Sequence, residues 1–169
     1  MRRATRHSIG DSRHECSDPM FGVAAGSRHG QAGTHVENGL AVALHGRPTF
    51  LDSTLAALAR DRSPAFAAAR GWVGLGAKLP TMISGSFALA ILEPLRKRAF
   101  LAIDRMGVER LCYARRDAQL VFGASVQSVA VHPALGRDID PQAIYDYLYF
   151  QMIPSPRTLY RGIEKLLPG

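Results

Sequence analysis

Few side chains in this sequence have the type and the spacing that nucleophilic catalysis or metal binding requires. The chain has two cysteines. Cys16 stands in a polar N-terminal segment, and Cys112 stands in an apolar run between Leu111 and Tyr113. Two cysteines in such different contexts indicate neither a disulfide framework nor a zinc site. A thiol in the middle of a buried strand is expected to be inert, because burial disfavours the reactive thiolate.

The glycines Gly71, Gly74 and Gly76 could suggest a phosphate-binding loop. Such loops follow a strand and end in Lys-Ser or Lys-Thr, because the lysine and the hydroxyl contact phosphate and magnesium. Here no strand is expected before the glycines, and Lys78 is followed by Leu-Pro. We therefore interpret these glycines as part of a turn.

Composition places the chain among soluble globular proteins. Its 169 residues, 47% hydrophobic and 21% charged, fit one domain with a substantial core. No apolar run approaches the roughly 20 residues that span a bilayer. The net charge of +7 comes from basic residues scattered over turns and helix faces, without interleaved aromatic residues, so we predict no nucleic-acid partner. A cytoplasmic location is expected.

The elements that must position any site centre on residues 83–133. Apolar runs separated by short turns predict four strands joined as an antiparallel meander, with both faces covered. They are Ser86–Leu92, Ala99–Ile103, Arg110–Ala114 and Gln119–Gly123.

The flanking segments have distinct patterns. Met1–Pro19 is polar and is predicted to be a disordered tail. The Gly- and His-rich Ser27–Asn38 is predicted as a loop. Caps and helical spacing predict four helices, at Asp52–Arg60, Ala65–Trp72, Ser125–Val131 and Asp138–Phe150.

Four stretches of the second half resemble a known family. They read GSFALAI from Gly85, FLAIDRMGVERLCYA from Phe100, LVFGASVQSVAVHP from Leu120, and IDPQAIYDYLYFQMIPSPRTLYRGIEKLLPG from Ile139. In order and spacing they are similar to the glutamine amidotransferase domain of glutamine-hydrolysing asparagine synthetases. The resemblance implies an α+β fold, the four-layer αββα sandwich of N-terminal-nucleophile amidotransferases, shortened on its N-terminal side.

The resemblance implies that Met20–Gly26 is the first strand, with Met20 or Met1 as the start of translation. It places Phe21 where the family has its nucleophile. Members of this class begin Met-Cys-Gly-Ile, and the cysteine must become the N-terminal residue so that its own α-amine can accept the thiol proton. A phenyl ring has no such chemistry, so no catalytic residue is predicted. Cys16 would be a nucleophile only after cleavage behind Glu15, and the resulting Cys-Ser-Asp-Pro does not match the family.

The substrate-binding positions also depart from the family pattern. Leu40–Phe50 resembles the family strand that ends in Asn-Gly-Glu, so a strand is expected there. His45 and Gly46, followed by Arg47, stand in the place of this Asn-Gly-Glu, whose Asn and Gly form the oxyanion hole in the family. Asp61 stands near the place of the Asp that holds the α-amine of glutamine. A surface histidine and a solvated helix-end carboxylate are the simpler interpretations of His45 and Asp61. The family arginine that grips the glutamine carboxylate has no counterpart.

The predicted organisation is a tail at 1–19, an amidotransferase-like domain at 20–152, and a linker at 153–169 leading toward an ATP-dependent synthetase domain absent from this chain. We expect a domain without glutaminase activity that docks on such a synthetase through its aromatic C-terminal segment. ATP and magnesium would belong to that partner, and this chain would need no metal or cofactor. Alternatives are an active glutaminase that uses a thiol such as Cys112, a non-functional gene fragment, a homo-oligomer, and a basic binding module.

Overall fold

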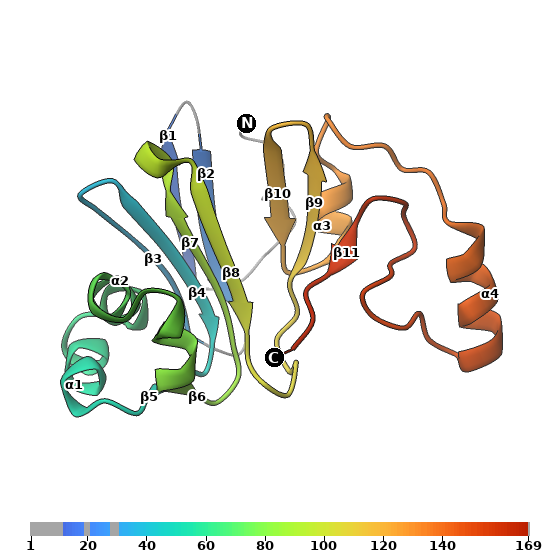
Figure 1. The fold of residues 1–169 in the computed structure, drawn as a ribbon. Helices are drawn as coiled ribbons and strands as arrows, with labels where there is room; N and C mark the ends of the chain where they lie inside the picture. The colour runs from blue at the N-terminus through green and yellow to red at the C-terminus, as the bar shows by residue number, and fades with distance from the viewer. Residues whose placement is uncertain (1–11, 19–20, 28–30, 169) are drawn as a thin grey trace.

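The strands of the computed structural model, which describes residues 12–18, 21–27 and 31–168, form two main sheets and two two-stranded pairs (Figure 1). The larger sheet has the order β3-β4-β7-β8, and all its neighbours are antiparallel. Its strands are β3 (Gln31–Glu37), β4 (Leu40–Gly46), β7 (Phe87–Glu93) and β8 (Arg98–Ile103). The class is therefore mixed α and β, as predicted.

Two helices cover one face of the larger sheet (Figure 1). They are α1 (Ser53–Asp61) and α2 (Pro64–Leu75). Because side chains alternate along a strand, every second residue of β4 and β7 points toward them. The buried core on this side includes Val42, Leu44, Leu89 and Ile91 from the strands and Ala65, Ala68 and Ala69 from α2.

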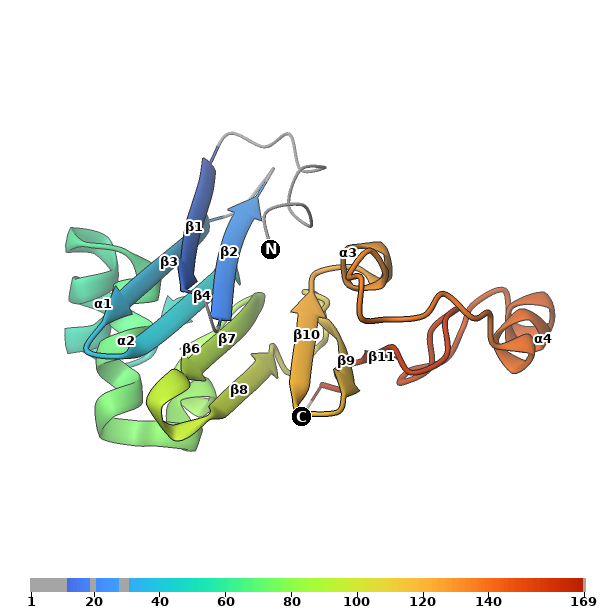
Figure 2. The same ribbon diagram turned by 90° about the horizontal axis from the view of Figure 1, so that it is seen from above.

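The opposite face of the larger sheet is covered by other strands. Ala41, Ala43, Ala90 and Leu92 are buried there, and Phe122 packs against them. The hairpin of β1 (Ser12–Asp18) and β2 (Phe21–Ser27) also lies against β3 and β4 on this side (Figure 2). The prediction that β7 is covered on both faces is confirmed.

A second sheet has the order β10-β9-β11. Its strands are β9 (Cys112–Arg116), β10 (Gln119–Gly123) and β11 (Glu164–Lys165). The predicted four-stranded meander is therefore wrong, because its first two strands belong to one sheet and its last two to another. The cause lies after β8, where the backbone N–H groups of Val108 and Glu109 donate to the side chain of Asp104. The chain leaves the edge of β8 instead of pairing with it.

The N-terminal region contains more strand than predicted. Gln31–Glu37, expected in a loop, is strand β3, because the turn residues Asn38 and Gly39 both have positive φ (50° and 74°) and allow a tight hairpin onto β4. Ser12–Asp18, expected in a disordered tail, is strand β1, whose backbone pairs along its whole length with β2. Residues 1–11 and Met20 lie outside the described residues.

The predicted helices are confirmed, with small shifts at their ends. Asp52 accepts a hydrogen bond from Leu55 N (2.8 Å) at the start of α1, and Ser63 accepts one from Phe66 N (3.1 Å) at the start of α2. Helix α2 continues to Leu75, beyond its predicted end. Helix α3 (Val126–Ala130) is capped by Ser125, and α4 (Pro141–Phe150) is capped by Asp140 with a proline in its first turn.

Several short elements connect the helices and strands described above. A 3₁₀ helix, η1 (Gly76–Met82), follows α2, and β5 (Thr49–Phe50) pairs with β6 (Ile83–Ser84) at the base of the larger sheet. A second 3₁₀ turn, η2 (Pro94–Arg96), joins β7 to β8. None of the described helices is long and apolar enough to cross a membrane.

The C-terminal segment returns to the second sheet. Residues 153–169, predicted as a linker, include β11, which pairs with β9, and Ile163, which is buried with Cys112, Ala114 and Val129. Helix α3 packs on the same sheet, whereas α4 stands away from both sheets (Figures 1 and 2). This part of the predicted linker is therefore folded against the domain.

Candidate functional site

The end of β4 lies in close contact with the segment that leads into β7, its antiparallel neighbour, and two glycines make this contact possible. The backbone N–H of Arg47 donates to the carbonyl of Ser86 (2.7 Å). Gly46 has φ 115°, and a Cβ there would overlap the carbonyl oxygen of Ser86. Gly85 has φ 82°, and a Cβ there would overlap the carbonyl oxygen of Arg47. Both positions need glycine for conformation and for space.

A small polar cluster lies at this contact. His45 Nδ1 lies 3.1 Å from Glu109 Oε2, and the Ser86 hydroxyl donates to Glu109 Oε1 (3.2 Å). The side chains of His45 and Glu109 are partly exposed, at 29% and 23%. One carboxylate therefore joins the end of β4, the start of β7 and the loop after β8.

Asp104 holds the loop that carries Glu109. Its side chain, with only 3% of the residue exposed, accepts hydrogen bonds from Val108 N (2.9 Å), Glu109 N (2.9 Å) and, more weakly, Phe87 N (3.4 Å). Burial alone would raise the pKa of Asp104, but these N–H groups outweigh it and lower the pKa below its usual value. The carboxylate therefore fixes both the path of the loop and the position of Glu109.

The cluster lacks the pairing that nucleophilic catalysis needs. An activated hydroxyl or thiol is hydrogen-bonded to its base, whereas the hydroxyl of Ser86 donates to Glu109 and has no hydrogen bond with His45. Cys112 is 3% exposed, and burial raises the pKa of its thiol, so it remains a protonated thiol in the core. Within residues 32–168, no group of three or more His, Cys, Asp or Glu side chains is placed to hold a metal ion. The cluster offers polar side chains that can bind and orient a ligand, but it contains no nucleophile hydrogen-bonded to a base.

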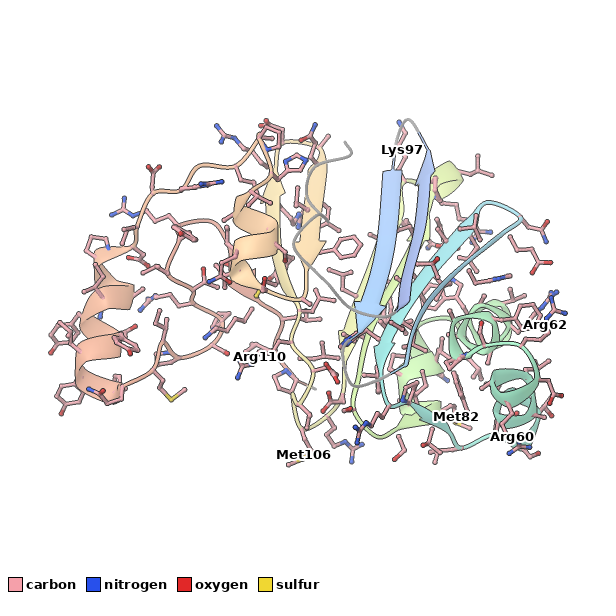
Figure 3. The ribbon with its side chains drawn as sticks, turned by 180° about the vertical axis from the view of Figure 1, so that it is seen from behind. Arg60, Arg62, Met82, Lys97, Met106 and Arg110 are labelled. Carbon is pink, nitrogen blue, oxygen red and sulfur yellow. The ribbon has the colours of Figure 1, made fainter. Side chains whose placement is uncertain are left out.

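The predicted site residues do not all come together. His45 and Gly46 lie in the cluster, whereas Asp61 is the exposed last residue of α1 and makes no side-chain hydrogen bond or ion pair within the described part of the chain. Its neighbours Arg60 and Arg62 lie on the outer side of the helix pair (Figure 3). The backbone of Phe21 begins β2, opposite Asp18. The side chains of Phe21 and Cys16 lie outside what the structure describes.

Sequence reasoning missed three members of the cluster. Ser86, Asp104 and Glu109 stand in the stretches that carry the family resemblance. Ser86 was predicted only as a strand residue and Asp104 only as a turn residue, and Glu109 was assigned no role. The available signal was Asp104 followed by Gly107. An acidic side chain followed three residues later by glycine favours a turn in which the carboxylate accepts backbone N–H groups.

Comparison with known proteins adds the family. A glutamine amidotransferase domain model matches residues 59–169, a range that includes Ser86, Asp104 and Glu109 but neither Phe21 nor His45. Similar curated proteins are asparagine synthetase [glutamine-hydrolyzing] 3 of Bacillus subtilis, 25% identical over 88 residues, and asparagine synthetase [glutamine-hydrolyzing] 1 of the same organism, 30% identical over 87 residues. Each alignment covers 52% of this chain and 14% of the relative.

A putative asparagine synthetase [glutamine-hydrolyzing] of Mycobacterium bovis is also similar, with 26% identity over 102 residues, 59% of this chain and 16% of the relative. The alignments thus span only a small part of the length of these relatives. Within that part, the motifs, the fold class and the family match agree. The chain therefore belongs to the glutamine amidotransferase domain family, as an asparagine synthetase-like member.

Proposed function

We propose that this chain is an amidotransferase-like domain that does not hydrolyse glutamine and serves as the structural, docking part of an ATP-dependent amide-forming enzyme of the cytoplasm. The observation that carries the proposal is the position of Phe21. It is the first residue of β2, and its backbone stands opposite Asp18 of β1. Its nitrogen is therefore a peptide nitrogen within a hairpin and cannot act as the α-amine base of this class.

The neighbourhood of Gly46 supports the same proposal. Stabilising a developing oxyanion requires donors that are not already engaged. The N–H of Arg47 already donates to Ser86 O, and the imidazole of His45 already faces the carboxylate of Glu109. An anionic neighbour at 3.1 Å opposes the development of a second negative charge beside it. His45, Gly46 and Asp61 are thus weak candidates for substrate binding.

The layers of the fold support a shortened N-terminal-nucleophile architecture. Helices α1 and α2, the larger sheet, the second sheet with the β1–β2 hairpin, and α3 follow one another in space (Figure 2). Phe122 of β10 packs on the larger sheet, and α3 packs on β9 and β10. We propose that this order is a reduced form of the αββα sandwich, with few residues in its outer helical layer.

The surface of α4 supports the docking role. Tyr145, Leu148, Tyr149, Phe150 and the following Met152 are all more than half exposed, Tyr149 at 72%. Tyr145 stacks on Tyr149 with ring centroids 6.3 Å apart, and Tyr149 meets Phe150 edge to face at 4.9 Å. We call these five residues the aromatic face. Ordered, exposed aromatic groups are typical of the core of an interface.

The partner we propose for the aromatic face is a synthetase domain, toward which residues 153–169 would lead. The relatives named as asparagine synthetases are much longer than the aligned region, so most of each relative lies outside the part that resembles this chain. ATP and magnesium would bind that partner. This chain would then contribute neither the ammonia nor the activated acid.

The test of activity is release of glutamate from glutamine by the purified full chain, with asparagine synthetase [glutamine-hydrolyzing] 3 of Bacillus subtilis as positive control. We expect no release above background. The variants Cys16→Ala and Cys112→Ala test the alternative that a thiol of this chain hydrolyses glutamine. Glutamate release by the parent chain that either substitution abolishes would refute the proposal, because it would identify a working thiol.

The test of docking is sedimentation of the chain alone and mixed with a second protein. That protein is the part of Bacillus subtilis asparagine synthetase [glutamine-hydrolyzing] 3 outside the region that aligns with this chain. We expect concentration-dependent self-association of the chain alone and a single defined complex after mixing. The double variant Tyr145→Ser, Tyr149→Ser should weaken both. A clean monomer that does not bind the added protein would contradict the docking role.

A further inference from the structure

Helix α4 carries the aromatic face although it has almost no core of its own. Of its ten residues, only Ala143 and Asp146 are buried. None of its apolar side chains belongs to the hydrophobic clusters formed by the described residues. In Figure 3 the side chains of α4 project largely away from the sheets. Hydrophobic packing, the usual source of helix stability in proteins, is therefore not what holds this helix.

Polar contacts hold α4 instead. Arg157 Nη1 donates to Asp146 Oδ2 (2.7 Å), and Arg157 Nε lies 3.5 Å from Asp140 Oδ2. The Gln142 side chain donates to the other oxygen of Asp146 (2.7 Å). One guanidinium thus bridges the N-cap residue and the middle of α4. We call Asp140, Asp146 and Arg157 the polar clamp.

The loop that supplies Arg157 is itself tied to the second sheet. Lys165 in β11 donates from its backbone N–H to Pro156 O (2.7 Å) and from Nζ to Ile153 O (2.6 Å). The buried hydroxyl of Thr158 donates to Ile163 O (2.7 Å). The residues on both sides of Arg157 are therefore fixed to the body of the domain, and the polar clamp transfers that position to α4.

An open pocket of about 380 Å³ adjoins the polar clamp, lined by all three of its members and by Thr158 and Arg161. Asp146 is the one residue of α4 in this lining, so the space beside the clamp is not filled by close packing. Without the clamp, the helix keeps its two chain connections and the backbone bonds near its start, Asp140 N to Leu159 O and Arg161 N to Asp138 O (2.9 Å each).

We propose that Arg157 is a positioning residue that holds α4, and with it the aromatic face, in the orientation that a partner binds. This inference rests on the docking role proposed above. Removing the guanidinium leaves the buried carboxylate of Asp146 with a single side-chain donor, Gln142, which disfavours the docked helix. Lysine replaces the guanidinium only in part, because an ammonium lacks the fork that reaches two carboxylates at once.

The test compares backbone amide hydrogen exchange in the intact chain and in Arg157→Ala, Arg157→Lys and Arg161→Ala. Arg161 is the matched control, since it belongs to the same loop and its side chain has no hydrogen bond or ion pair with another described residue. In Arg157→Ala we expect the amides of 145–150 to exchange at least about tenfold faster, while those of β4 and β7 keep their rates, because local opening is independent of the core. Arg157→Lys should lie between, and Arg161→Ala should match the parent chain.

Unchanged exchange of α4 in Arg157→Ala would overturn the inference. If Arg157→Ala speeds exchange in β4 and β7 as well, the same measurement is made on Asp146→Asn. This variant keeps the shape of the buried side chain and removes its charge. Faster exchange confined to α4 supports the polar clamp, and parent-like exchange overturns it.

A binding experiment separates the docking role from the positioning role of Arg157. It measures binding to the part of Bacillus subtilis asparagine synthetase [glutamine-hydrolyzing] 3 outside the aligned region. If the parent chain binds and Arg157→Ala binds at least tenfold more weakly, the positioning role is supported. Equal binding by the two would overturn it. If the parent chain itself does not bind, the docking role fails, and a clamp confirmed by amide exchange remains as a property of the fold.

Discussion

Replacing Asp104 by Asn tests how strongly one buried carboxylate supports the candidate site. The substitution keeps the size of the side chain and removes its charge. In the parent chain, Oδ1 accepts from Glu109 N and Phe87 N, and Oδ2 accepts from Val108 N (2.9 Å). An amide can reproduce the first set with its oxygen, but its NH₂ group then faces the N–H of Val108. One accepted hydrogen bond becomes a contact between two donors.

The expected loss follows from these contacts. A hydrogen bond to a charged group contributes about 1.5–3 kcal/mol, and a buried donor left unsatisfied costs about 1–3 kcal/mol. Counting one lost charge-assisted bond and a partly exposed donor gives a decrease of about 2–4 kcal/mol in the free energy of unfolding. For a chain of this length each kcal/mol corresponds to about 2–4 °C in Tm, so a decrease of this size is readily measured.

Urea unfolding of the parent chain and of Asp104→Asn provides the assay, with Asp117→Asn as control. Asp117 is exposed in a turn at φ 53°, a conformation that Asn adopts readily. The control removes the same charge and should change stability by less than about 0.5 kcal/mol. A loss in Asp104→Asn as small as that of the control would refute the reasoning that the carboxylate organises the loop.

The pH dependence adds a second check. The pKa of Asp104 is lowered in the folded chain, so its contribution is fully present above the unfolded value of about 3.9 and is lost as the pH falls through the lower, folded value. The stability difference between the parent chain and Asp104→Asn should therefore be constant from about pH 7 to pH 5. It should shrink below about pH 4. A difference that grows on acidification would contradict the assignment of the pKa shift.

Two further predictions concern the close contact at Gly46 and the buried thiol. Gly46→Ala should destabilise the chain by at least about 2 kcal/mol, because it combines a positive φ with overlap of a backbone carbonyl. The control is Gly74→Ala in α2, where a Cβ meets nothing within 4 Å. In the same urea experiment this control should be neutral or stabilising by up to about 1 kcal/mol. In a Cys16→Ser background, Cys112 should react with a disulfide reagent only at the rate of unfolding, because it is buried and burial raises the pKa of its thiol; fast reaction in the native chain would show that the thiol is accessible.

Local signals predicted the helices and the central hairpin well. Asp52, Ser63, Ser125 and Asp140 each cap the helix that follows, because a short polar side chain can accept the free N–H groups of the first turn. The hairpin from β7 to β8 was predicted because its strands are adjacent in sequence. These features depend on neighbours along the chain, which the sequence displays directly.

Features that depend on distant residues were missed or misjudged. The Asn38-Gly39 turn was a usable signal for β3, but the polar composition around it favoured a loop, and only pairing with β4 makes these residues a strand. The meander failed because the Asp104 carboxylate attracts the N–H groups that would otherwise have continued the ladder. The polar cluster at Glu109 was not foreseen, since it joins three segments that are separate in sequence.

The close contact at Gly46 and Gly85 bears on how this domain can change through evolution. At each glycine the backbone of the opposite segment leaves no room for a Cβ. A side chain at either position would push the two segments apart, whereas His45 has no such backbone constraint. Retention of the two glycines in a sequence therefore reports on the fold and does not by itself report glutaminase activity.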